Sequence, residues 1–306
     1  MIYSQTCCSG GVPISSNLGF APGSIGTWQF SLSYDINVLK TLKEGSNVLN
    51  DDARERVTQS ILLQTGYSIT NRISADIFFS YVKQERTIQQ FDKKDYVSTN
   101  GIGDAALLLK YTLTDPNKHK ILFTLAVGPK FPTGRSDLTR EDRIPLNADL
   151  QPGSGSWDAL FWASGIYKFN FRPTFNISST IIVSYKGKNN NYLNGQTYQF
   201  GNELQAIFSF NDNFLVGKKI LDVVLNFRYR KALTDQFNDL TMPNTGGVWL
   251  FTAPSVAYNF SQKIAINANV EIPVFGKVEG TQLSPTFRLN AGMFIKIHKK
   301  NEILKL

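Results

Sequence analysis

The chain has 306 residues, of which 42% are hydrophobic and 18% charged, and its 32 Lys and Arg against 24 Asp and Glu give a net charge of +8. No unbroken apolar run reaches the roughly 20 residues that a membrane-spanning helix needs, which excludes a helical membrane protein. The basic residues are spread along the chain without a recognition helix or a glycine-rich phosphate loop, so we expect no nucleic-acid partner.

Alternation of apolar and polar residues recurs along the chain, and a period of two is typical of β-strands, whose successive side chains point to opposite sides. In residues 220–231 the apolar face runs from Leu221 to Tyr229, while Asp222 and Arg228 lie on the other face. At about 9 to 14 residues, the predicted strands have the length that a tilted strand needs to cross a membrane. In chain order they are residues 26–35, 57–69, 72–87, 103–113, 120–130, 157–169, 175–186, 200–210, 220–231, 248–260, 264–272 and 286–297.

The connections between these strands alternate between short and long. The short ones are residues 70–72, 115–118, 170–173, 211–217 and 261–263, and the long ones are residues 35–56, 89–101, 132–156, 187–199, 231–247 and 276–284. Strict alternation puts every short turn and both termini at one end of the fold, which is the layout of bacterial outer-membrane barrels. Aromatic residues gather near both strand ends, as interfacial girdles do.

We therefore predict an all-β, transmembrane, antiparallel up-and-down β-barrel of about 12 strands, with short periplasmic turns and long extracellular loops. The barrel would occupy residues 25–297, followed by a polar tail at residues 298–306. A soluble β-sandwich or lipocalin-like barrel that binds an apolar ligand is the alternative, because alternation alone does not say which face meets water.

Residues 1–24 are expected to be a leader, a periplasmic segment or a plug. The start lacks the apolar core of a signal peptide, yet Ile2-Tyr3-Ser4 before Gln5 is similar to the end of one, so we expect a longer precursor that is cleaved near Gln5. Cys7 and Cys8 are the only cysteines. They could bind a soft metal ion such as Cu(I), form a disulfide or remain inert thiols.

In a barrel, the polar face of each strand would point into the lumen. The charged residues predicted to line a solute pathway are Asp76, Asp104, Lys110, Glu203, Asp222, Arg228, Arg230, Glu271, Arg288 and Lys296. Such charges either sort solutes, as in channel constrictions, or close the lumen with ion pairs. The longest loop, residues 132–156, would be a constriction or a solvated surface loop, and its candidate constriction residues are Arg135, Asp137, Arg140, Glu141, Asp142 and Arg143.

Three segments, "GIGDAALLLKYTL" (101–113), "GPKFPTGRSD" (128–137) and "LQPGSGSWD" (150–158), resemble a family of outer-membrane β-barrel transporters associated with the phenol meta-degradation pathway. The matched residues are Gly103, Asp104, Lys110, Tyr111, Gly128, Lys130, Pro132, Thr133, Gly134, Gln151, Pro152, Gly153, Gly155 and Asp158. The resemblance implies a barrel that passes small molecules, hydrophobic ones included, without a catalytic set or a cofactor. The polar ending departs from the family, whose barrels commonly end on an aromatic residue.

The sequence thus predicts a channel in the bacterial outer membrane that passes small hydrophobic or anionic solutes by passive diffusion through a polar, charge-lined lumen. The alternative is a non-conducting scaffold that docks an envelope protein or another copy of the chain, with metal bound at the Cys pair. We predict no enzyme activity, because His119 and His298 have no Ser partner suggested by the sequence and no G-x-S-x-G motif occurs.

Overall fold

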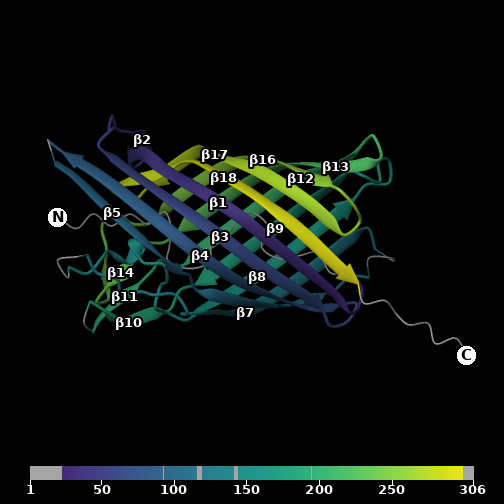
Figure 1. The fold of residues 1–306 in the computed structure, drawn as a ribbon, viewed down its shortest axis with the longest axis horizontal. Coiled ribbons are helices and arrows are strands. Elements are labelled where there is room, and N and C mark those ends of the chain that lie inside the picture. Colours follow the sequence, from purple (N-terminus) through teal and green to yellow (C-terminus); the bar gives the residue numbers. More distant parts are fainter. Residues whose placement is uncertain (1–22, 92, 116–118, 141–143, 194, 299–306) are drawn as a thin grey trace, which may run out of the picture.

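Twelve antiparallel strands form a closed barrel in the computed structural model, which describes residues 23–91, 93–115, 119–140, 144–193 and 195–298 (Figure 1). Each strand pairs with the previous and the next one, and the last pairs with the first. The predicted fold class is confirmed. The barrel strands are β1 (Thr27–Glu44), β3 (Arg54–Ser68), β4 (Ile73–Gln90), β6 (Ala105–Thr112), β7 (Ile121–Phe131), β8 (Asp158–Lys168), β9 (Asn176–Tyr185), β12 (Glu203–Val216), β13 (Lys219–Ala232), β16 (Gly247–Asn259), β17 (Ile264–Val278) and β18 (Thr281–His298).

The barrel closes through β1 and β18, whose register runs from Thr27 opposite His298 to Glu44 opposite Thr281. Closure leaves no open sheet edge, so the backbone groups of the first and last strands pair with each other. Within the described residues, none of the helical segments has the length and apolar character of a membrane span.

The short turns and the longer connections lie at opposite ends of the barrel. The turns that join β3 to β4, β6 to β7, β8 to β9, β12 to β13 and β16 to β17 lie at the end where β1 starts and β18 finishes (Figure 1). The other end carries the smaller elements. These are β2 (Asn47–Val48), β5 (Lys93–Ile102), the 3₁₀ turn η1 (Ala148–Leu150), β10 (Lys188–Tyr192), β11 (Gln196–Gln199), β14 (Gln236–Phe237) and β15 (Leu240–Thr241).

Two of the expected long loops are largely strand. Residues 93–102 form β5, which pairs with β4 from Tyr81–Ile102 to Gln90–Lys93, and β17 and β18 are separated only by residues 279–280. The sequence of β5, "KKDYVSTNGI", reads as a loop because its residues are mostly polar and show no clear apolar face. Backbone pairing with β4 nevertheless holds it in a strand, since main-chain hydrogen bonds do not depend on an apolar face.

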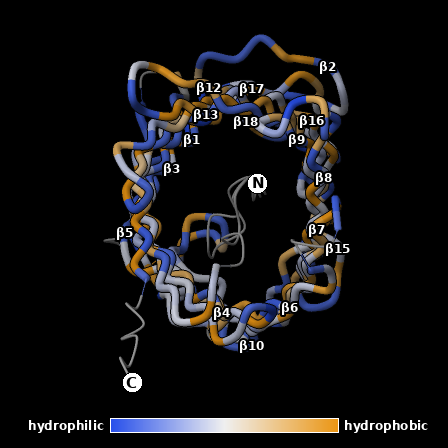
Figure 2. The backbone as a smooth tube through the Cα atoms, turned by 90° about the vertical axis from the view of Figure 1, so that its right-hand side faces the viewer, coloured by the Kyte–Doolittle hydropathy of each residue, from blue (hydrophilic) through white to orange (hydrophobic). Residues whose placement is uncertain are grey.

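The outward face of the barrel is apolar and the inward face is not exposed. In β13, Val223, Leu225 and Phe227 are 37 to 44% exposed, whereas Asn226 and Arg228, on the other face, are 5% and 4% exposed. Figure 2 shows the strands as a ring in which apolar and polar positions alternate along the tube. An apolar exterior around a closed barrel suits the hydrocarbon of a membrane.

Aromatic side chains cluster beside the short turns, as predicted. At the turn between β8 and β9, the ring of Phe169 lies 4.8 Å from Tyr167 and 5.3 Å from Phe175. Trp28 and Tyr67 form a pair at 4.6 Å on β1 and β3. Amphipathic rings at one level of the barrel match an interfacial girdle.

We predict that Leu63→Arg lowers the free energy of unfolding in phospholipid vesicles by about 2–4 kcal/mol, the cost of a cation on the lipid face near the midplane. Leu63 lies on the outward face of β3, between Leu32 of β1 and Phe79 of β4, which are also about half exposed. The measurement is urea unfolding of the vesicle-inserted barrel. Val48→Arg, on the exposed β2, is the control and should change little; equal losses in both variants would contradict a lipid-facing Leu63.

Candidate functional site: the interior of the barrel

Buried charged residues on the inner wall are paired with residues of opposite charge on other strands. Lys110 of β6 lies 2.5 Å from Asp76 of β4, and both side chains are almost completely buried. Arg230 of β13 lies 2.7 Å from Glu203 of β12. A buried charge without a partner would cost several kcal/mol, so these pairs are what allows the charges to stay inside the wall.

A second network joins four adjacent segments of the wall. The ammonium group of Lys130 lies 2.6 Å from Asp104 and 3.1 Å from Asp158, and Lys186 lies 3.3 Å from the same Asp158 oxygen. Asp104, Lys130 and Asp158 belong to the three sequence segments that resemble the transporter family. The structure therefore brings these motif residues together in one buried ion-pair network.

Arginine residues dominate the other side of the interior. Arg228 forms a bidentate ion pair with Glu271, with 2.7 Å between Nε and Oε2, and its guanidinium lies 4.3 Å from the ring centre of Phe251. Arg288 of β18 lies 2.7 Å from Asp35 of β1. Together these contacts tie β13 to β17 and β18 to β1.

Two predicted lumen residues remain, Asp222 and Lys296, and both are half-buried. Asp222 accepts a hydrogen bond of 2.8 Å from Asn259, and Lys296 lies on β18. The sequence interpretation missed Asp35, Lys130 and Lys186 as interior residues, although each continues the polar phase of its own predicted strand. Extending the alternation to the strand ends would have found them.

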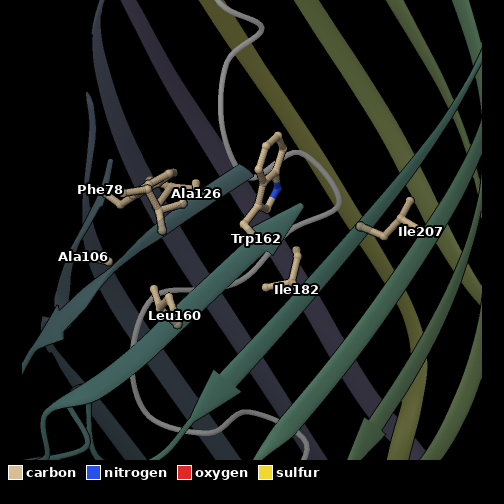
Figure 3. Packing of buried hydrophobic residues seen from close by; sticks show 9 residues of the cluster. Phe78, Ala106, Ala126, Leu160, Trp162, Ile182 and Ile207 are labelled. Atoms are coloured by element: carbon tan, nitrogen blue, oxygen red, sulfur yellow. The ribbon is translucent and has the colours of Figure 1, made fainter. Parts of the chain in front are cut away.

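Part of the inner wall is apolar, which the prediction of a polar lumen did not include. Buried hydrophobic residues form one continuous cluster across neighbouring strands from β3 to β12, which Figure 3 shows as sticks. We call it the apolar sector. Its members are Leu62, Phe78, Ala106, Leu108, Ala126, Leu160, Trp162, Ile182 and Ile207. Runs such as "AALLLKY" are apolar on both faces, so alternation gave no sign of this sector.

The loop of residues 132–156, which we call the inner loop, folds against the inner wall. Asp149 pairs with the fully buried Arg56 of β3 at 2.7 Å. The carbonyl oxygens of Leu150 and Gln151 accept hydrogen bonds from Thr99 (2.6 Å) and Gln84 (3.1 Å). Because these partners are inward-facing residues of β3, β4 and β5, the loop covers the inside of the wall at the long-loop end.

Asp104 connects the inner loop to the buried network. Its carboxylate accepts hydrogen bonds from the backbone N–H groups of Gly134 (3.1 Å) and Ser154 (3.0 Å) while it pairs with Lys130. Gly134 and Gly153 touch backbone to backbone: a Cβ on Gly153 would lie 2.5 Å from the carbonyl carbon and oxygen of Gly134. Only two residues without side chains allow this approach.

Of the candidate constriction residues in the described part of the chain, Arg140 is the one that contacts a strand. Arg135 and Asp137 are exposed and pair with each other at 3.1 Å, and Arg140 pairs with Asp95 of β5. Glu141, Asp142 and Arg143 lie outside the described residues. The docking groups are Asp149, Gln151 and Ser154; of these, only Gln151 was among the residues matched to the family.

A four-stranded sheet of β10, β11, β14 and β15 packs over the inner loop. Asn189 of β10 donates a hydrogen bond of 3.2 Å to the carbonyl of Ser154, and the hydroxyl of Tyr198 donates one of 2.5 Å to Asp235. Asp235 has no exposed surface, and its burial raises the pKa of this carboxyl to about 7, although the hydrogen bond from Tyr198 acts in the opposite direction.

The described residues contain no group of three or more His, Cys, Asp or Glu side chains that could hold a metal ion. Cys7 and Cys8, the predicted metal ligands, lie outside the described residues. His298 forms a hydrogen bond of 2.8 Å with the hydroxyl of Thr27, which links the ends of β18 and β1.

Residues 55–283 match the model of the family described as "Putative MetA-pathway of phenol degradation". The chain belongs to this family. Among solved structures, the COG4313 outer membrane channel from Pseudomonas putida F1 is 14% identical and has a TM-score of 0.72, with 92% of this chain and all of that chain covered. The toluene transporter TodX of P. putida is less similar, at 10% identity and a TM-score of 0.43, with 89% and 90% covered. A search of curated proteins finds no match.

Family membership, the closed barrel and its apolar exterior identify an outer-membrane β-barrel, located in the bacterial outer membrane. By the layout of such barrels, the short turns face the periplasm, and the inner loop and the four-stranded sheet lie at the extracellular end.

We predict that Gly153→Ala detaches the inner loop, because the new Cβ would collide with the backbone of Gly134 rather than with a side chain that can move. Hydrogen–deuterium exchange of the peptide that contains residues 146–154 should become about tenfold faster, which corresponds to about 1.4 kcal/mol, within the roughly 1–3 kcal/mol that such a clash costs. Gly165→Ala is the matched control, since its Cβ would meet only the side chain of Phe123 at 3.7 Å. Unchanged exchange in Gly153→Ala would show that the loop is not held by this contact.

We predict that the four-stranded sheet opens more readily as the pH rises from about 4 to 7. Asp235 has a pKa of about 7 in the fold against an ordinary 3.8, so the docked state keeps a proton that the opened state releases. The docked sheet is therefore most stable below pH 4. Between pH 4 and 7 its amide protection falls by up to about tenfold per pH unit, and above pH 7 it stays constant. The measurement is the amide protection of residues 233–246 as a function of pH, corrected for intrinsic exchange. In Asp235→Asn this protection should not change with pH. An equally steep profile in that variant would assign the titration to another group.

Proposed function

We propose that the protein is an outer-membrane channel through which small apolar or weakly polar organic molecules diffuse passively. The observation that carries this proposal is the apolar sector, because a purely aqueous pore has no use for a continuous set of inward-facing hydrophobic side chains. These side chains are 1 to 8% exposed, so a solute reaches them when the packing inside the barrel opens. The family's description, which names phenol degradation, supports a solute of this class.

The paired charges support a solute without net charge. Arg56, Lys110, Lys130, Arg228 and Arg230 each lie next to a carboxylate. A neutralised wall concentrates neither anions nor cations at its surface, whereas charge-selective pores present rings of one sign. The anionic solute considered from the sequence is therefore less well supported than the hydrophobic one.

The inner loop supports a limit on solute size. It docks on the inner faces of β3, β4 and β5 at the extracellular end, where a solute from outside would enter. A loop fixed to the wall by an ion pair and several hydrogen bonds narrows the entrance permanently, so we expect small molecules to pass and oligosaccharides to be excluded.

We predict two results for the purified barrel in planar lipid bilayers. Discrete conductance steps in KCl should appear, and the reversal potential in a KCl gradient should lie near zero, because the inner charges are paired. Strong anion selectivity would contradict the neutral wall. If the barrel inserts and is heat-modifiable but shows neither conductance nor solute uptake, the result would favour the non-conducting scaffold.

The role of the apolar sector is tested by uptake of radiolabelled toluene into porin-deficient Gram-negative cells, whose lipopolysaccharide layer slows unassisted entry. Leu160→Asn combined with Ile182→Asn should lower the initial uptake rate about threefold or more, since the apolar sector would then carry two amides among its hydrophobic side chains. Leu160→Ile with Ile182→Leu is the control, because it keeps the surface apolar. Equal initial uptake rates for the two double variants would contradict the proposed route along this sector.

A further inference from the structure

A small apolar cavity lies at the extracellular end, between the inner loop and the four-stranded sheet. Its volume is about 50 Å³, and its wall is almost entirely carbon. The residues that line it are Asn147, Ala148, Tyr192, Leu193, Tyr198, Phe237 and Met242. It is separate from the apolar sector, none of whose members lines it.

The aromatic walls of the cavity are held in place. The ring of Tyr192 lies 5.0 Å from that of Tyr198 and meets Phe237 edge-on at 6.2 Å. The hydroxyl of Tyr198 is fixed by its hydrogen bond to Asp235, which in turn accepts a bond of 2.8 Å from the backbone of Gly201. Walls whose orientation is already set lose little conformational entropy when a ligand binds.

We propose that this cavity is a binding site for a small uncharged apolar molecule, an aromatic ring or a short alkyl group. The inference rests on the proposed function and deepens it, because a site at the extracellular end would collect such molecules before they enter the lumen. A charged ligand would have to give up its hydration for walls of carbon, which is costly. Edge-to-face contacts with Tyr192 and Phe237 suit an aromatic ring.

The size of the cavity is compatible with such a ligand once Met242 moves. A cavity of about 150 Å³ is known to hold benzene, so a cavity of about 50 Å³ accommodates part of a ring. Met242 lies half-buried at its edge, outside the strands. Its unbranched side chain changes conformation at low cost and is the residue we expect to make room.

The test uses crystals of the full barrel soaked in iodobenzene, whose iodine is located by anomalous scattering. We expect an iodine peak within the cavity of the wild-type protein and its loss in Met242→Trp, in which the larger side chain fills the space. Leu240→Trp is the matched control, because it adds the same group to β15 at an exposed position that does not line the cavity. Its iodine peak should remain.

Uptake of toluene at low concentration gives a second readout. Met242→Trp should raise the concentration for half-maximal uptake about fivefold and leave the maximal rate unchanged, whereas Leu240→Trp should alter neither. If the wild-type cavity contains no iodine but uptake is normal, the binding site is refuted and the channel is not. Iodine in the cavity without any uptake would keep the site and refute the channel. An iodine peak that persists in Met242→Trp, with that side chain seen to fill the cavity, would also overturn the assignment.

Discussion

In hydrocarbon, each backbone N–H or C=O without a hydrogen-bond partner costs several kcal/mol, so a chain that crosses a membrane with strands must close on itself. The pairing of β1 with β18 meets this requirement over the full length of both strands. Closure also fixes the two faces of the wall. A shift of β1 by one residue would turn Tyr34 into the lumen and carry Asp35 into lipid, away from its partner Arg288 of β18.

Inside the wall a second requirement applies, because a buried charge is stable only beside its counter-charge. Asp104, which has no exposed surface, has its counter-charge in Lys130. Its carboxylate also accepts hydrogen bonds from two backbone N–H groups of the inner loop. Asp104 lies in the short break between β5 and β6, where its backbone is not committed to a strand. The same carboxylate therefore stabilises the wall and holds the loop, so the shape of the entrance depends on an ion pair of the barrel itself.

The sequence was sufficient to predict the barrel, because a period of two and the alternation of turns follow directly from membrane-crossing strands. The alternation puts both partners of three interior ion pairs, such as Asp76 with Lys110, on the inward face of their strands. It gave no sign of the pair between Arg56 and Asp149, because these two residues are 93 positions apart and meet only when the inner loop folds inward. The apolar sector was also missed. Where a strand is apolar on both faces, as at Leu107 and Leu108, periodicity cannot tell lipid from lumen, and only the register with neighbouring strands decides.

The two sides of the interior differ in chemistry, and this difference narrows the kind of solute that the proposed channel suits. From β3 to β12 the wall includes the apolar sector, and from β12 to β1 it carries arginines that are paired with Glu271, Glu203 and Asp35. The first side also carries paired charges, such as Lys110 with Asp76 and Lys130 with Asp104, so the continuous apolar sector is what distinguishes it. On the second side the buried amides are engaged as well. Gln205 accepts a hydrogen bond from Arg228 and donates one to Glu203, and Asn226 accepts one from Ser209 and donates one to the carbonyl of Ala253. In the proposed channel, the part of the wall that offers carbon to a solute is therefore the first side.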